Sequence, residues 1–308
     1  MTEPLPPRAA ATSGGDFAIS VILPHYNDLE NLGRCLDLLA DQRLDVPFEV
    51  IVADNNSTCD RGRLEAVCRR SNVRLVDAPR QGAAEARNVG VEASGATRLA
   101  FIDSDCLPGP DWLGKGLRAL DGSPLVGGRI TVGTADPAQL TPAEAFERIF
   151  AFNNERYLRE EKFSVTANMF TTRAVFDRVG GFRNGVSEDV DWGQRAAALG
   201  YDWHYAPEAC LEHPARRTWP ELTRKWKRLM RESYLLDRER GGGRGRWLLR
   251  NWLVALSIPV AMMKALRSRE VPSAADRFKA AAVVARLRLW RFAEAHRLAL
   301  RASAPGAA

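Results

Sequence analysis

The sequence has 308 residues, of which 45% are hydrophobic and 27% charged, enough apolar material for one large folded core. Its five cysteines form no CxxC pair, which argues against a disulfide framework and a zinc cluster. Residues 1–214 carry 22 basic and 31 acidic side chains, whereas residues 215–308 carry 22 and 7. We therefore expect a first part able to hold a cation and a second part attracted to an anionic surface.

The amino-acid composition divides the chain into three segments. Residues 1–16 are rich in proline, alanine and glycine and have no long apolar run, so we predict a disordered lead-in that is neither a signal peptide nor an anchor. A catalytic domain is predicted for residues 17–214. Basic helices that contain tryptophan, interrupted by a GGGRGR stretch, make residues 215–308 a helical tail.

Strand and helix patterns alternate along the first half of the chain. Short apolar runs predict strands at 17–27, 48–57, 73–79 and 97–108. Apolar residues at helical spacing predict helices at 27–42, 61–71 and 81–94. Such alternation predicts an α/β fold with a parallel sheet covered by helices on both faces.

The second half of the first part continues with less regular patterns. They predict a strand at 125–133, a helix at 141–161, a strand and helix at 164–182, a helix at 187–200, and a strand pair or a strand and turn at 201–214.

Asp103 and Asp105 lie in the segment FIDSD, directly after a predicted strand. In open α/β sheets, ligands bind outside the carboxyl ends of the strands. A hard divalent cation held by carboxylates neutralises the charge that a diphosphate leaving group develops. The two residues therefore predict a site for Mg²⁺ or Mn²⁺, the alternative being an acidic turn that ends a strand.

The chain resembles the family-two inverting glycosyltransferases over roughly residues 19–213. The resemblance is carried by five elements in the family's order: SVILPHYN, VADNNS, GAAEARNVG, FIDSD, and SEDVDWGQR followed by LEH. It implies the GT-A fold, a Rossmann-like mixed and mostly parallel sheet. It also implies a hexosyltransferase type of enzyme that moves a sugar from a nucleotide-diphosphate donor, by default a UDP-sugar, to a saccharide or lipid-linked acceptor in envelope or exopolysaccharide synthesis.

The resemblance assigns metal and catalytic roles to five residues. Asp105 binds the metal, Asp103 contacts the ribose or the metal's water, and His213 supplies a third ligand that favours manganese over magnesium. Asp189 is the general base that deprotonates the acceptor hydroxyl, with Glu188 beside it. Carboxylates also lie at helix N-termini for structural reasons, which is the alternative for this pair.

The resemblance also assigns donor contacts. Pro24 and Tyr26 shape the loop that packs the base, and Asp54 contacts the nucleobase or ribose. Asn55 stands where the commoner DDGS motif has a carboxylate, which weakens the assignment of the nucleotide. Arg87 is expected to reach the base or the diphosphate.

On the acceptor side, the resemblance places Asn168 and Trp192. Trp192 is a candidate for stacking on a sugar ring, although a tryptophan one turn into a helix more often belongs to the core.

The basic tail contains two stretches that suggest a membrane surface. Residues 251–263 are free of charge but broken by Pro259, and they are shorter than the roughly 20 residues that span a bilayer. Residues 286–301 have the pattern of a basic amphipathic helix. We expect a cytoplasmic protein attached peripherally to the anionic inner face of the plasma membrane, or else a helical appendage that packs on the catalytic domain. No nucleic-acid motif accompanies the basic residues, so no nucleic-acid partner is expected.

Two other functions were compared with the transferase. A nucleotidyltransferase of similar fold usually begins with a glycine-rich phosphate loop, where this chain has PHYND. A catalytically silent nucleotide-sugar or membrane-binding protein has no need for the acidic residues and His213. Both comparisons favour the transferase.

Overall fold

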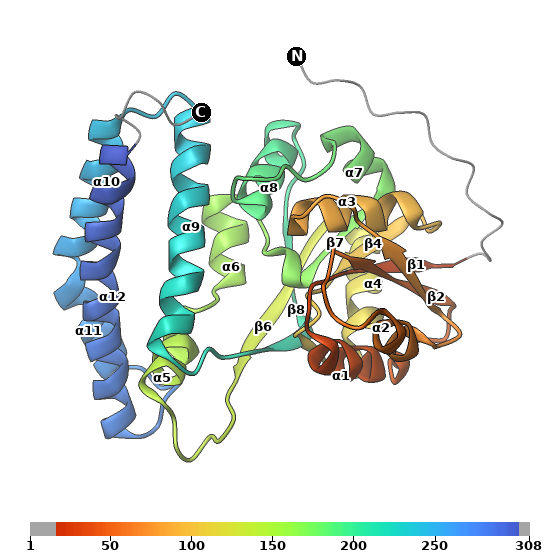
Figure 1. The fold of residues 1–308 in the computed structure, drawn as a ribbon, viewed down its shortest axis with the longest axis horizontal. Helices are drawn as coiled ribbons and strands as arrows, with labels where there is room; N and C mark the ends of the chain where they lie inside the picture. The colour runs from red at the N-terminus through yellow and green to blue at the C-terminus, as the bar shows by residue number, and fades with distance from the viewer. Residues whose placement is uncertain (1–16, 302–308) are drawn as a thin grey trace. The chain divides into compact units, whose positions relative to one another are not determined.

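The computed structural model describes residues 17–301, which form two compact units, and the predicted lead-in at 1–16 lies outside the described residues (Figure 1). The first unit comprises the described residues up to Ile130 together with 154–184 and 188–212. The second comprises 131–153, 185–187 and the chain from His213. The chain enters the second unit for the last time at His213, close to the predicted boundary after Pro214. Two earlier segments, 131–153 and 185–187, belong to the same unit as the C-terminal helices.

An eight-stranded sheet organises the first unit, in the order β3-β2-β1-β4-β7-β6-β8-β5. Four neighbouring strands run parallel: β3 (Val73–Asp77), β2 (Phe48–Asp54), β1 (Ile19–His25) and β4 (Arg98–Phe101). The remaining strands are β7 (Met169–Thr172), β6 (Leu125–Gly133), β8 (His204–Pro214) and β5 (Leu107–Pro108). Pairing of β7 with β4 and β6, and of β5 with β8, is antiparallel, which makes the sheet mixed.

Helices cover both faces of this sheet, as the alternating pattern predicts. Val21 and Leu23 of β1 pack in one core cluster, whereas Ile22 packs in another, because successive side chains on a strand point to opposite faces. The first cluster includes residues of α1 (Leu29–Ala40), α2 (Arg61–Cys68) and α4 (Trp112–Gly122). The second includes residues of α3 (Ala83–Ala93), α7 (Arg173–Val179) and α8 (Glu188–Ala198). Figure 1 shows α1 and α2 on one side of the strands and α3 and α7 on the other.

Several expected elements differ from the observed ones. The predicted helix 141–161 is divided into α5 (Pro142–Phe150), α6 (Asn154–Arg156) and a π-helical turn, because the chain turns after α5 and the Asn154 amide donates to the Gly128 carbonyl (2.8 Å). The predicted strand 97–108 is divided by the acidic loop, and 201–214 forms the single strand β8. Helix α4 was not predicted.

Among its described residues, the second unit has five helices: α5, α9 (Trp219–Glu239), α10 (Arg244–Leu256), α11 (Ile258–Leu266) and α12 (Ala274–Arg301). The long helix α12 contacts the other four. Pro259 lies in the first turn of α11, where a missing N–H is tolerated, and the chain bends by 42° between α10 and α11. Among the described helices, none alone has the length and apolar character of a membrane span, although this bent pair does when taken together.

Candidate active site

Polar residues occupy the carboxyl ends of β1 and β2, which pair in register so that His25 lies opposite Asp54. The buried His25 ring accepts the Asp28 N–H at Nε2 (3.1 Å), so its proton is on Nδ1, which donates to Asp54 Oδ1 (3.0 Å). The backbone N–H of Ser57 also donates to Asp54 (3.2 Å). Burial alone would raise the pKa of Asp54, but the hydrogen bonds from Ser57 and His25 outweigh it and lower that pKa. Asp54 is therefore held as an oriented carboxylate.

A hydrogen bond connects the loop after β2 to the start of α3. Asn55 Oδ1 accepts the backbone N–H of Gly82 (2.8 Å). Gly82 has a φ of +146°, and a Cβ there would lie 2.2 Å from the Asn184 amide oxygen, so only glycine fits. Tyr26 is 47% exposed and Pro24 is half-buried at the same end of β1. The four residues predicted for nucleoside contact thus come from two neighbouring strand ends.

Arg87 connects two motifs that are far apart in the sequence. Its guanidinium is 4% exposed and donates to Asp103 Oδ1 (2.6 Å) and to Glu188 Oε1 (3.0 Å). Burial disfavours the charged guanidinium, yet the charges of Asp103 and Glu188 hold the pKa of Arg87 above its usual value. The expectation that Arg87 reaches the base or diphosphate stays a prediction, because in this structure it binds the two carboxylates.

The first turn of α8 carries three carboxylates with different surroundings. Glu188 is tied to Arg87, and Asp189 is half-buried with its Oδ1 near the Val190 N–H (2.8 Å). Asp191 is buried and lies between Arg183 and Arg195. Burial would raise the pKa of Asp191, but these arginines lower it. Asp191 is therefore held by two arginines, and the catalytic roles expected for Asp189 and Glu188 stay predictions.

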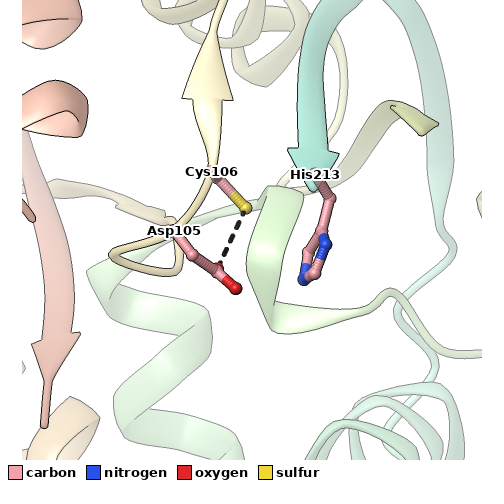
Figure 2. Close-up of side chains that lie close together, drawn as sticks. All are labelled: Asp105, Cys106 and His213. Carbon is pink, nitrogen blue, oxygen red and sulfur yellow. Dashed lines mark hydrogen bonds between the residues drawn. The ribbon is translucent and has the colours of Figure 1, made fainter. Parts of the chain in front are cut away.

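A second group gathers Asp105, Cys106 and His213, whose possible ligand atoms all lie within 4.8 Å of one another (Figure 2). The antiparallel register explains it: Leu107 lies opposite Glu212, so the preceding Cys106 comes next to His213. His213 Nδ1 donates to the Pro214 carbonyl (2.9 Å), so Nε2 carries the lone pair that can bind a metal.

The buried Cys106 Sγ donates to Asp105 Oδ1 (4.0 Å). Burial, together with the charges of Asp103 and Asp105, raises the pKa of this thiol well above the usual value. The carboxylate oxygen of Asp105 and the imidazole nitrogen of His213 suit Mn²⁺ and, less well, Mg²⁺. Asp103 does not belong to this group, since its carboxylate is bound by Arg87.

The two residues predicted on the acceptor side are buried. Trp192 has no exposed surface, donates to the Gly180 carbonyl (2.8 Å) and packs against Phe176 and Phe182. This burial fits the alternative of a core tryptophan and leaves no ring face for a sugar.

Asn168 is equally buried. Its Nδ2 donates to the carbonyls of Arg129 and Ala209 (2.9 and 3.0 Å), and its Oδ1 accepts from the Trp112 indole (2.9 Å). These bonds hold β6, β8 and α4 together, so the side chain acts as a structural link.

The sequence prediction gave no role to His25 and Cys106. His25 is the last residue of β1, and Cys106 directly precedes β5. Their neighbours are set by the pairing of β1 with β2 and of β5 with β8, so strand register is the signal that would have identified them.

Comparison with known proteins gives a consistent result. Residues 20–180 match the family model described as Glycosyl transferase family 2. Glycosyltransferase AglE of Haloferax volcanii is 32% identical over 231 residues, 71% of this chain and 75% of the relative. Validoxylamine A glucosyltransferase of Streptomyces hygroscopicus subsp. jinggangensis is 29% identical over 65% of this chain and 56% of its own length.

Solved structures support the fold. The mannosyltransferase PcManGT from Pyrobaculum calidifontis, in complex with GDP-Man and Mn²⁺, superposes with a TM-score of 0.53 at 18% identity and covers 96% of this chain and 77% of the other. TarS of S. aureus gives a TM-score of 0.50 at 18% identity over 91% and 43%. At this identity, the similarity establishes the GT-A architecture alone.

Proposed function

The chain belongs to glycosyl transferase family 2 and is a glycosyltransferase, and on that premise we propose that it transfers a sugar from a nucleoside-diphosphate donor with inversion at the anomeric carbon. The observation that carries the proposal is the buried Arg87, which holds the acidic loop after β4 beside the first turn of α8. This contact supports the proposal, because it brings the carboxylates proposed for the donor and for the acceptor hydroxyl close together. A nucleotidyltransferase is disfavoured by the family, and a silent binding protein by these carboxylates.

Asp105 and His213 are the proposed protein ligands of a divalent cation, Mn²⁺ or Mg²⁺, because they bring a hard oxygen and an imidazole nitrogen together. When bound, such a cation neutralises the charge of the departing diphosphate. PcManGT was solved with GDP-Man and Mn²⁺, which supports a metal-dependent donor site of this type. Asp103, still partly exposed beside Arg87, is proposed to contact the ribose or the metal's water.

Asp189 is the proposed general base. Glu188 is committed to Arg87 and only 14% exposed, so it is better suited to position the acceptor than to accept its proton. A carboxylate at Asp189 can take the hydroxyl proton as the oxygen attacks the anomeric carbon. The nucleoside is proposed to lie against Tyr26, Pro24 and the oriented Asp54.

A donor-binding assay tests this assignment. Wild-type protein is titrated with UDP- and GDP-sugars, with and without Mn²⁺, and binding is followed by the thermal shift that a native-state ligand produces. Asp105→Ala should abolish the metal-dependent shift. Asp111→Ala is the matched control, because Asp111 is half-exposed in a nearby loop and forms only a 3.8 Å pair with Arg43. Wild-type metal-dependent binding by Asp105→Ala would refute the metal assignment.

A membrane-facing role for the second unit rests on one side of α10 and α11. Exposed apolar side chains recur there at helical spacing: Leu249, Trp252, Leu253, Leu256, Val260 and Met263. Basic residues flank this stripe, and residues 215–308 have a net charge of +15. Apolar burial and attraction to anionic lipids act together on such a surface, each basic residue contributing about 1 kcal/mol. We therefore propose peripheral attachment to the cytoplasmic face of the plasma membrane, with a saccharide or lipid-linked acceptor in envelope or exopolysaccharide synthesis.

Co-sedimentation with anionic liposomes tests this attachment. Wild-type protein should sediment at low salt and dissociate as salt rises. Leu253→Asp/Val260→Asp should abolish sedimentation, whereas Val46→Asp/Leu199→Asp, an equal exchange at exposed sites of the first unit, should not. Wild-type protein that ignores anionic liposomes at low salt would refute the membrane role.

A further inference from the structure

Helix α9 has a buried side and a strongly basic side. It begins with a capping box between Thr218 and Glu221, and its buried residues are Leu222, Met230, Tyr234, Leu236 and Asp237. Their spacing places them on one side of the helix, and α9 contacts α12. Lys225 pairs with the buried Glu147, but the other cations in the middle of the helix are exposed on its remaining surface: Arg224, Lys227, Arg228 and Arg231.

A pocket of about 400 Å³ lies on the basic side of α9. Four cations line it at helical spacing: Arg224, Lys227, Arg228 and Arg231. Like charges three and four residues apart destabilise a helix, so this arrangement has an energetic cost that a ligand would offset. Glu232 is the acidic lining residue and pairs with Arg228 (3.6 Å).

The chemistry of the pocket favours a phosphate. Arginine presents a planar fork of N–H donors that matches phosphate oxygens in pairs. A carboxylate carries one negative charge, whereas a phosphate monoester or a diphosphate carries the two or more that four cations can neutralise. The volume lies within the usual range of small-ligand sites, roughly 300–1,000 Å³. Leu235, one turn beyond Arg231, is 37% exposed and adds an apolar wall.

The pocket is linked through the chain to the proposed base. Gly185 lines it, and Ser187 Oγ lies 3.4 Å from Ser233 Oγ of α9. Glu188 follows Gly185 by three residues, a separation that the chain can extend to about 11 Å at most. A ligand in the pocket therefore lies against the segment that leads directly into the first turn of α8.

We propose that this pocket binds the phosphate groups of the acceptor, a sugar or alcohol joined to an apolar chain through a diphosphate. The inference rests on the proposed function and specifies the acceptor class. The phosphate groups are held by α9, and the apolar chain leaves along Leu235.

Calorimetric titration with three probes tests the site: a short water-soluble prenyl diphosphate, the matching prenyl alcohol, and inorganic pyrophosphate. Wild-type protein should bind the prenyl diphosphate and not the alcohol. Arg224→Gln/Lys227→Gln/Arg231→Gln should weaken this binding at least about tenfold, since each removes a charge-assisted hydrogen bond. An equal loss of charge at exposed sites of the first unit is the control and should stay within about twofold: Arg34→Gln/Arg63→Gln/Arg118→Gln.

The remaining outcomes separate this inference from the proposed function. Pyrophosphate that binds as tightly as prenyl diphosphate would identify a free-anion site and overturn the acceptor role, as would unchanged binding by the triple α9 variant. Manganese-dependent donor binding is measured in the same samples. Intact donor binding with no prenyl diphosphate binding would reject the inference alone, whereas absent donor binding in the wild type would reject the proposed function.

Discussion

Arg87→Met removes the guanidinium that holds Asp103 and Glu188 together, and its effect can be estimated from the structure. Removing one partner of a buried ion pair costs about 3–5 kcal/mol, because the remaining charge is left without compensation. Asp103 is 32% exposed and can be hydrated, so we expect about 3 kcal/mol, near the lower limit. At about 2–4 °C per kcal/mol for a large domain, the thermal midpoint should fall by roughly 6–12 °C.

Differential scanning calorimetry measures this fall, with Arg61→Met as the control. Arg61 also pairs with two carboxylates, Glu65 and Asp77, but all three side chains are about half exposed or more, so the loss should stay below about 1 kcal/mol. Arg87→Lys retains the charge but loses the fixed pair of N–H donors, so its thermal midpoint should lie between those of wild type and Arg87→Met. Equal midpoint shifts for Arg87→Met and Arg61→Met would refute the bridging role.

Three further outcomes follow from the surroundings of single residues. Hydrogen bonds lower the pKa of Asp54 in the folded protein, so the ionised side chain stabilises the fold at pH values above its unfolded pKa of about 3.9. This stabilisation is lost as the pH falls through the folded pKa, and the difference in urea midpoint between wild type and Asp54→Asn should shrink over that range. Gly82→Ala should cost more than about 1 kcal/mol in urea unfolding because of its positive φ, whereas Gly122→Ala, with open space around it, should be neutral or stabilising; equal effects would contradict this. Iodoacetamide at pH 8 should alkylate the partly exposed Cys59 long before the buried, high-pKa Cys106, as peptide mass spectrometry can show; the reverse order would contradict the burial of Cys106.

Local patterns predicted the parallel half of the sheet and the acidic motifs well. Each strand from β1 to β4 is an apolar run, and each intervening helix has its own apolar spacing, so no distant contact is needed to recognise them. The acidic loop at Asp103 and Asp105 follows a strand end, which places it at the ligand-binding edge of any such fold.

Features that depend on distant partners were not predicted. His25 orients Asp54 because β1 and β2 pair in one particular register, which neither strand shows alone. The break after α5 depends on Asn154, whose amide binds the backbone of β6. For Trp192 the sequence left a sugar contact and a core position open; Ala196, four residues later, marks the same side of α8 as apolar, and both side chains are buried.

Steady-state and binding measurements on Asp189→Asn test the central claim most directly. A general base acts mainly in the transition state, so kcat for sugar transfer with Mn²⁺ should fall by a factor on the order of a hundred or more. Donor Kd should stay close to the wild-type value, because the amide keeps the shape of the side chain. A variant that retains wild-type kcat, or that loses donor binding in proportion to its activity, would contradict the account.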